Sequence, residues 1–129
     1  MLDAQPYFPG RAPIDAYGNG GFRFADMSHR GSLLIVPSGV YAWDVADFDA
    51  LIANPRAPSL ARFLDELKPP AFVLLGTGIE HRMPPKPMAD LFMAAGIALE
   101  PMATGAAART YNVLLAEGRT FGAALIAVD

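Results

Sequence analysis

The sequence contains no cysteine among its 129 residues, and this absence excludes several kinds of chemistry. Without thiols the chain cannot form disulfides, bind zinc or iron–sulfur clusters through sulfur, or use a thiol nucleophile. It also lacks an apolar run of membrane-spanning length and a basic-then-apolar leader pattern. We therefore expect a cytoplasmic protein without membrane insertion.

Concentrated positive charge is also missing, because the net charge is −3 and the ten Lys and Arg residues are scattered along the chain. A protein that binds nucleic acid normally gathers such residues into a stripe or patch. Histidine is scarce, since His29 and His81 are the only two, and neither has a metal-ligand or nucleophile–base spacing. We expect no nucleic-acid partner, no metal, no cofactor and no catalytic residue.

The composition is that of one folded domain, with 53% hydrophobic and 18% charged residues. A chain of this length buries one core but not two. Pro6, Pro9 and Pro13 mark residues 1–13 as an N-terminal arm without regular structure. Residues 14–129 are expected to form a single α/β domain.

Strand patterns dominate the first part of that domain. Residues 14–17 and 22–24 are short β-prone runs on either side of a Gly/Asn turn, which predicts a hairpin. His29 is expected in a turn. The apolar runs 32–36 and 40–43 are separated only by Pro-Ser-Gly, which favours one long strand bent at that break.

Helical spacing follows in two short segments. Asp47 is placed to cap a helix that continues to Ile52, because its carboxylate can accept from first-turn amides. Leucine and phenylalanine residues between Leu60 and Leu67 recur at helical spacing, and Pro69 ends that pattern.

The second half predicts a βαβ unit, from an apolar strand at 71–75, a helix at 87–95 and a strand at 97–100. A helix at 104–117, capped by Thr104, and a last strand at 121–128 complete the chain. The predicted fold is a three-layer α/β domain with a central mixed sheet and an N-terminal β-hairpin.

Gly76, Thr77 and Gly78 end the first strand of the βαβ unit, where open α/β sheets commonly bind ligands. A dinucleotide site does not fit, because His81 stands at the third glycine of the fingerprint and a Pro-rich segment delays the helix. The alternative is a tight strand-to-helix turn with a purely structural role.

The start of the 104–117 helix has amide donors that suit an anion, and these belong to Thr104, Gly105 and Ala106. Arg82 is a further candidate donor from the loop before the helix at 87–95, and Arg109 is another. For both arginines the alternative is a solvated surface position. Together these residues predict one concave ligand-binding site beside the Gly76–Gly78 turn.

Structural roles are expected for three other polar residues. Asn112 should hydrogen-bond a neighbouring loop. Glu117 and Arg119, on either side of Gly118, should form an ion pair.

Several short segments occur together in an order and spacing shared with a known family. They are residues 73–78 (Val-Leu-Leu-Gly-Thr-Gly), Arg82, 96–98 (Gly-Ile-Ala), Thr104, Ala106, 110–112 (Thr-Tyr-Asn), 117–119 (Glu-Gly-Arg) and 123–126 (Ala-Ala-Leu-Ile). The chain resembles a family of small α/β domains that includes the mitochondrial complex I (NADH dehydrogenase alpha subcomplex) assembly factor 3, an adipogenesis-associated human protein and many uncharacterised prokaryotic proteins. The resemblance covers about residues 14–127.

That resemblance implies a three-layer fold with a mixed sheet, and it implies no catalytic activity. Two functional hypotheses follow. The first is a non-enzymatic binding or assembly-factor-like module with a protein partner. The second is a small-molecule enzyme or anion sensor that uses the Gly76–Gly78 crevice for a small anionic ligand.

Overall fold

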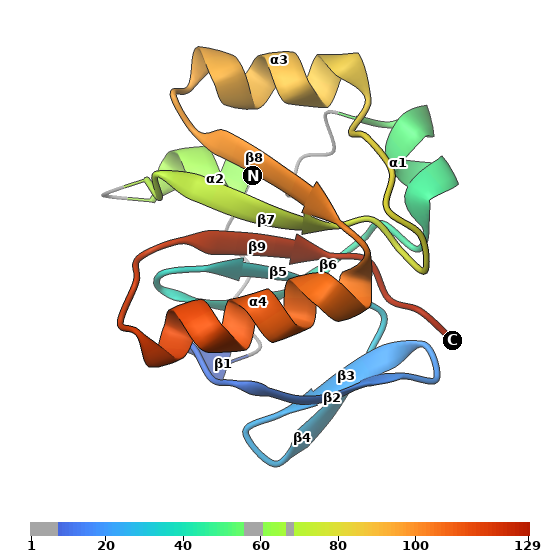
Figure 1. Ribbon diagram of the computed structural model, residues 1–129, viewed down its shortest axis with the longest axis vertical. Coiled ribbons are helices and arrows are strands. Elements are labelled where there is room, and N and C mark those ends of the chain that lie inside the picture. The colour runs from blue at the N-terminus through green and yellow to red at the C-terminus, as the bar shows by residue number, and fades with distance from the viewer. Residues whose placement is uncertain (1–7, 56–60, 67–68) are drawn as a thin grey trace.

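A computed structural model describes residues 8–55, 61–66 and 69–129 of the chain. In this part the strands are β1 (Phe8–Pro9), β2 (Ile14–Gly18), β3 (Gly21–Phe24), β4 (Met27–Arg30), β5 (Ser32–Val36), β6 (Gly39–Trp43), β7 (Phe72–Gly76), β8 (Ala98–Met102) and β9 (Gly122–Leu125). The helices are α1 (Phe48–Ala53), α2 (Ala61–Asp65), α3 (Lys86–Ala94) and α4 (Thr104–Ala116). Figure 1 shows their arrangement around a central sheet.

The central sheet is mixed, with six strands in the order β1-β6-β5-β9-β7-β8. Strand β7 is parallel to both of its neighbours, β8 and β9, whereas β5 is antiparallel to β9 and β6. The inner strands β5 and β9 are buried along their whole length. Their sequences are therefore continuous rather than alternating apolar runs, as expected for strands covered on both faces.

The predicted βαβ unit is confirmed, because β7 and β8 pair in parallel and α3 connects them. Proline at the start of α3 removes an amide that has no partner in a first helical turn. Met88 and Phe92 of α3 are buried against the sheet. The helix begins one residue earlier than predicted, and β8 extends two residues further.

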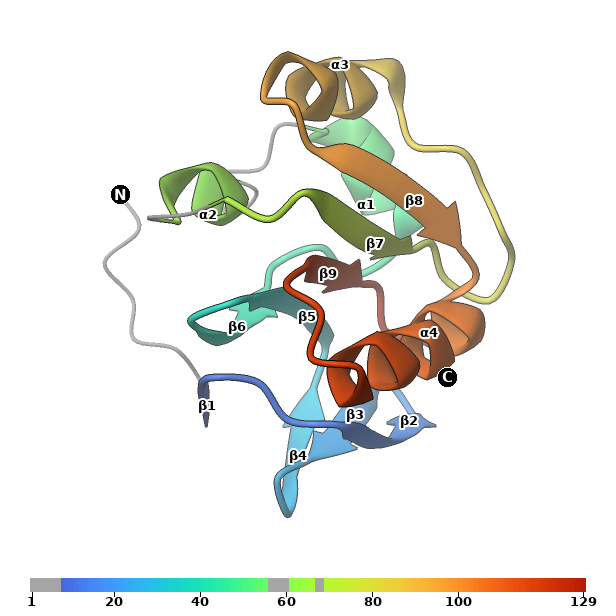
Figure 2. The same cartoon turned by 60° about the vertical axis from the view of Figure 1, so that its left-hand side comes forward.

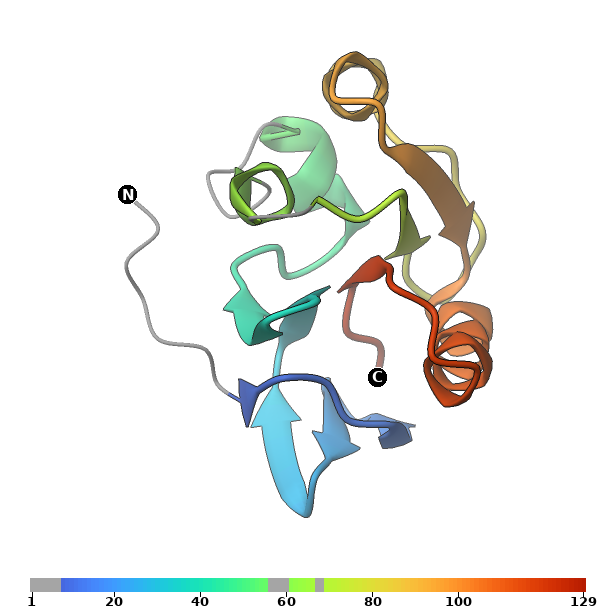
Figure 3. The ribbon, with the colours of Figure 1, turned by 90° about the vertical axis from the view of Figure 1, so that its left-hand side faces the viewer.

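Side chains from the two faces of the sheet build two apolar clusters, and the predicted three layers are confirmed. Val73 and Leu75 of β7 join the cluster beneath α1, α2 and α3, whereas Leu74 joins the cluster beneath α4 and the three-stranded sheet β2-β3-β4. Figures 2 and 3 show α1, α2 and α3 on one side of the central sheet and β2, β3, β4 and α4 on the other.

The N-terminal hairpin is confirmed, and a third strand is added to it. Strands β2 and β3 pair as predicted, and β4 pairs antiparallel with β3. The turn between β3 and β4 has Ala25 and Asp26 at φ 51° and 60°, the positive values of a two-residue hairpin turn. The prediction that His29 lies in a turn is wrong, because His29 belongs to β4.

The predicted long bent strand is also wrong. Strands β5 and β6 form an antiparallel hairpin, in which Val36 pairs with Gly39 across a two-residue turn. A Pro-Ser pair between apolar runs can bend one strand or reverse the chain, and here reversal brings both runs into the sheet. The arm is not free of structure either, because Phe8 pairs with Val40 in β6.

The two short helices agree with their sequence patterns. Asp47 caps α1, and its Oδ1 accepts a hydrogen bond from the Ala50 amide at 2.8 Å. In α2, Phe63 is fully buried and its ring lies 5.8 Å from that of Phe92 in α3. Leu60 and Leu67, the outer positions of the predicted pattern, lie outside the described residues.

Candidate functional site

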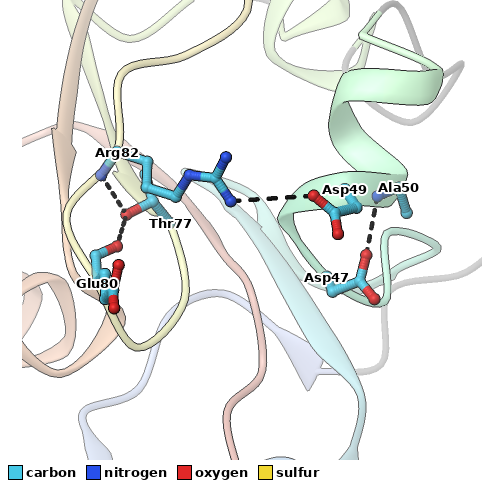
Figure 4. Close-up of polar contacts among 6 residues, drawn as sticks. All are labelled: Asp47, Asp49, Ala50, Thr77, Glu80 and Arg82. Carbon is cyan, nitrogen blue, oxygen red and sulfur yellow. Dashed lines mark hydrogen bonds and ion pairs between the residues drawn. The ribbon is translucent and has the colours of Figure 1, made fainter.

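Thr77 organises the loop that follows β7. Its hydroxyl donates to the Glu80 carbonyl at 2.6 Å and accepts from the Arg82 amide at 3.1 Å, as Figure 4 shows. Its own amide donates to the carbonyl of Met102, at the end of β8. Because these bonds lie within the protein and Thr77 is 2% exposed, the hydroxyl stabilises the loop.

Thr104 connects three segments that are distant in the sequence. Its amide donates to the Gly78 carbonyl, and its Oγ1 accepts from the Gly78 amide at 3.0 Å and donates to the Ile126 carbonyl at 2.7 Å. Gly76 permits the close approach of Thr104 to β7, because a Cβ at Gly76 would lie 3.0 Å from Thr104 Oγ1 and 3.2 Å from Thr104 Cα. The predicted proximity of the turn and the helix start is therefore present in the structure.

The capping role predicted for Thr104 is wrong. The residue at the cap position of α4 is Ala103, which makes no side-chain cap bond, and Thr104 is the first helical residue. Its hydroxyl instead bonds two loops, and its amide is already used by Gly78. One of the donors predicted to receive a ligand is thus occupied within the fold.

A hollow of about 450 Å³ opens beside this turn, and three predicted site residues line it: Thr77, Gly78 and Arg82. The remaining walls come from residues 46–49 at the start of α1 and from residues 126–129 after β9. The hollow therefore combines segments from the middle, the second half and the end of the described chain.

Arg82 extends across this hollow toward α1 (Figure 4). Its guanidinium carbon lies 4.3 Å from the Phe48 ring centroid, and Nη1 lies 3.9 Å from Asp49 Oδ1. Asp47 and Glu80 also line the hollow. Because several carboxylates surround one arginine, the lining favours a neutral or cationic group over an anion. The ligand-binding role of Gly76, Thr77, Gly78 and Arg82 stays a prediction.

The other predicted site residues face a different neighbour, Tyr17 of β2. A Cβ at Gly105 would lie 2.5 Å from the Tyr17 hydroxyl oxygen, so the ring covers this side of the helix start. Arg109 Nη1 donates to the same hydroxyl at 3.3 Å. Gly105, Ala106 and Arg109 do not line the hollow at Arg82. They therefore lie outside this hollow although the helix start is next to the turn, and their binding role also stays a prediction.

Asn112 has a structural role, but its partner is a strand and not the predicted loop. It accepts from the Ile14 amide and donates to the Ile14 carbonyl, both at 2.8 Å, which joins α4 to β2. The ion pair predicted between Glu117 and Arg119 is confirmed. Arg119 Nη1 lies 3.9 Å from Glu117 Oε1, and both side chains are about half exposed.

Tyr111 is a buried titratable group beside these contacts. Its hydroxyl donates to the Ala12 carbonyl at 2.8 Å. Burial raises the pKa of Tyr111 to about 12, and the nearby Arg11 charge opposes that rise. At neutral pH the hydroxyl is therefore protonated and stabilises the segment that precedes β2.

A second hollow of about 420 Å³ lies between α3 and β8, and sequence reasoning missed it. Apolar residues line it, and among them Met83 is 69% and Met93 is 77% exposed. Met93 was the residue in the sequence that could have indicated this hollow. It is apolar, but it lies off the face of α3 that carries the buried Met88 and Phe92. An unusually apolar outer helix face is a sign of contact with another surface.

Strand β8 is the edge of the central sheet next to this hollow. The Ala98 amide and the Met102 carbonyl bond toward β7, so Leu99 and Pro101 have their backbone groups on the open side. Proline has no amide hydrogen, and it limits pairing with an added strand. A partner at this edge would mainly contact side chains.

The described part of the chain has neither a metal-binding cluster nor a helix that could span a membrane. Among the described residues, no group of three or more His, Cys, Asp or Glu side chains is placed to hold a metal ion. None of the described helices combines the length and apolar character needed to cross a bilayer.

The chain is similar to known proteins along almost its whole length. Over 98% of its length the chain is 43% identical to an uncharacterized protein of Rhodobacter capsulatus, and it covers 93% of that protein. It is 32% identical over 95% of its length to NADH dehydrogenase (ubiquinone) 1 alpha subcomplex assembly factor 3 of Mus musculus, and it spans 64% of the length of that protein.

The fold has also been observed experimentally in a related protein. A crystal structure described as an outer membrane protein from Bartonella henselae matches with a TM-score of 0.86 and 49% identity, over 95% of this chain and all of the other. A family model described as protein of unknown function (DUF498/DUF598) matches residues 14–126. The resemblance noted in the sequence is therefore confirmed, and the chain belongs to the DUF498/DUF598 family.

Proposed function

We propose that this chain is a non-enzymatic, assembly-factor-like module that binds a protein partner through the hollow between α3 and β8. The observation that carries the proposal is the exposure of Met83 and Met93 at the rim of a hollow lined by apolar residues. Exposed apolar patches commonly mark interaction sites, and methionine adapts its shape to a partner surface.

The partner we propose is a protein with an apolar segment that fills this hollow. Pro101 limits the hydrogen bonds available at the β8 edge, so side-chain packing rather than strand addition would provide the affinity. The name of the mouse relative supports a partner among the subunits of a respiratory complex. The absence of cysteine fits a reducing compartment, and we place the interaction in the cytoplasm.

The test uses the double variant Met83→Glu/Met93→Glu in the native cell, with affinity-tagged protein and quantitative mass spectrometry. We expect the partner that copurifies with the wild-type chain to be lost, because charged side chains cannot be desolvated in an apolar contact. Both methionines are mostly exposed, so the thermal midpoint should change little.

Val113→Glu is the matched control, because Val113 is 57% exposed and lies on α4, on the other side of the central sheet. Retention of the same partner by the folded double variant would refute the proposed surface. Equal loss of the partner in Val113→Glu would show that negative charge in general, and not this hollow, explains the result.

The alternative is a small-molecule site at the Gly76–Gly78 turn, and the 450 Å³ hollow beside Arg82 favours it. In that case Arg82→Ala should weaken binding of the small molecule that protects the chain most in a thermal-shift screen, while Met83→Glu/Met93→Glu should leave that binding unchanged. The opposite pattern would reject this alternative.

A further inference from the structure

The three-stranded sheet has a hollow of about 370 Å³ on the face turned away from the core. Strand alternation and register place six residues on this face: Ala16 and Gly18 of β2, Gly21 and Arg23 of β3, and Ser28 and Arg30 of β4. Phe22 and Phe24, which alternate with them, are buried in the core.

The hollow exists because three of these positions have almost no side chain. Ala16, Gly18 and Gly21 form its floor, and the long side chains of Arg23 and Arg30 stand beside it. Gly21 is required by packing as well, because a Cβ there would collide with the His29 carbonyl oxygen.

The two arginines bring like charges close together on this face. Arg23 Nη1 donates to Ser28 Oγ at 3.0 Å, which holds that guanidinium across the sheet. Arg23 pairs with Ser28 and Arg30 with Gly21, so the arginines are diagonal neighbours, with Cα atoms about 7–8 Å apart. An anion between them would relieve their repulsion and accept hydrogen bonds from both.

No carboxylate in the described part of the chain neutralises either arginine. Neither Arg23 nor Arg30 forms an ion pair with a described acidic residue, and no acidic residue lines the hollow. This contrasts with the chain as a whole, which has a net charge of −3, and with the hollow at Arg82. Positive charge is therefore concentrated here.

Tyr17, Phe22 and His29 also belong to the lining of the hollow. Strand alternation places their side chains on the core-facing side of the sheet, where the Tyr17 hydroxyl accepts from Arg109 Nη1 and His29 Nε2 lies 3.2 Å from the Ser32 carbonyl oxygen. The charged side chains on the face of the hollow are therefore those of Arg23 and Arg30.

We propose that this hollow is an oxyanion site that binds the phosphate group of a small ligand through Arg23 and Arg30. A phosphate monoester carries about −1.5 to −2 charges at neutral pH, which matches two guanidinium groups. The small floor residues allow the phosphate oxygens to approach the sheet, and Ser28 keeps one guanidinium in place. This site is separate from the apolar hollow between α3 and β8.

The test is a titration of the ¹⁵N-labelled chain with inorganic phosphate at pH 7, with sodium chloride used to keep the ionic strength constant. We expect saturable amide shifts confined to β2, β3 and β4. Arg23→Gln and Arg30→Gln should each weaken binding about tenfold, the usual effect of losing one charge-assisted hydrogen bond. Acetate, with a single charge, should bind more weakly than phosphate.

Two further variants separate a shaped site from general electrostatic attraction. Ala16→Leu fills the hollow without changing the charge and should also weaken phosphate binding, whereas Arg119→Gln, which removes a half-exposed arginine on another part of the surface, should not. Equal shifts in wild type and the folded Arg30→Gln variant would overturn the proposal. Arg119→Gln weakening binding as much as Arg30→Gln, or acetate binding as tightly as phosphate, would overturn it too.

Discussion

At the scale of single residues, two threonines define the end of the central sheet. Thr77 folds the loop after β7 back on itself, and Thr104 joins that loop to the segment after β9. Both side chains are almost completely buried, and their hydroxyl groups satisfy backbone groups that would otherwise lack partners. The arrangement beside Arg82 therefore depends on side chains with a structural role.

Tyr111 leads to a prediction about pH at the same scale. Its pKa is raised from 10.0 to about 12 in the folded chain, so the unfolded chain ionises first as the pH rises. The stabilising contribution is complete below pH 10 and is lost between pH 10 and 12, by up to about 3 kcal/mol. Tyr111→Phe should remove this part of the pH dependence.

Urea denaturation of wild type and Tyr111→Phe at pH 8 and pH 11 measures this difference. At pH 8 the variant should be less stable by about 1 kcal/mol, because the Ala12 carbonyl loses its hydrogen bond. At pH 11 that deficit should shrink or reverse. Parallel stability curves for the two proteins across this range would contradict the raised pKa.

At the scale of elements, the contact between α2 and β9 depends on a glycine. A Cβ at Gly122 would lie 2.6 Å from Cε1 of the Phe63 ring and 3.1 Å from the Ile35 carbonyl oxygen. Phe63 is fully buried and cannot move to an exposed position without uncovering the core. The short helix α2 can therefore pack closely on the sheet only where β9 has no side chain.

Gly122→Ala should destabilise the chain by about 1–3 kcal/mol, the usual cost of overpacking a core. In a Phe63→Leu background the same substitution should cost less, because the smaller side chain leaves space for the added methyl group. Chemical denaturation of the two single variants and the double variant measures this coupling. An equal cost in both backgrounds would show that the clash with Ile35 dominates.

At the scale of the whole molecule, the two apolar clusters share one sheet. Leu34 of β5 belongs to the cluster under α1, α2 and α3, and its neighbours Leu33 and Ile35 belong to the other. Strands β7 and β9 contribute to both clusters in the same way. Loss of the sheet removes the support of both clusters, so we expect them to unfold together.

Two reporters can test this cooperativity in one urea titration followed by NMR. Trp43, the only tryptophan, lies in the first cluster, and Tyr111 lies in the second. Their native signals should disappear with the same midpoint. Midpoints that differ beyond experimental error would show that the two sides of the sheet unfold as separate units.

Local sequence signals determined most of the element boundaries. Apolar runs, the capping Asp47 and the proline at the start of α3 act within a few residues, and each of these elements appears close to its predicted place. The βαβ unit and the three layers follow from the order of those elements. The proximity of Gly78 and Thr104 was predictable for the same reason, because both follow strands that are parallel neighbours.

Only the tertiary structure decided which segments meet across the sheets. The residues on either side of Pro37 could form one strand or a hairpin. They form a hairpin in which β5 also pairs with β9 and β6 also pairs with β1, and the periodicity of the sequence does not show which strands will pair. The polar strand β4 forms because β3 offers it an unpaired edge. Asp47 and Asp49 beside Arg82, and Tyr17 over Gly105, come from distant segments of the sequence. Their effects on charge and packing therefore arise only when the sheets assemble.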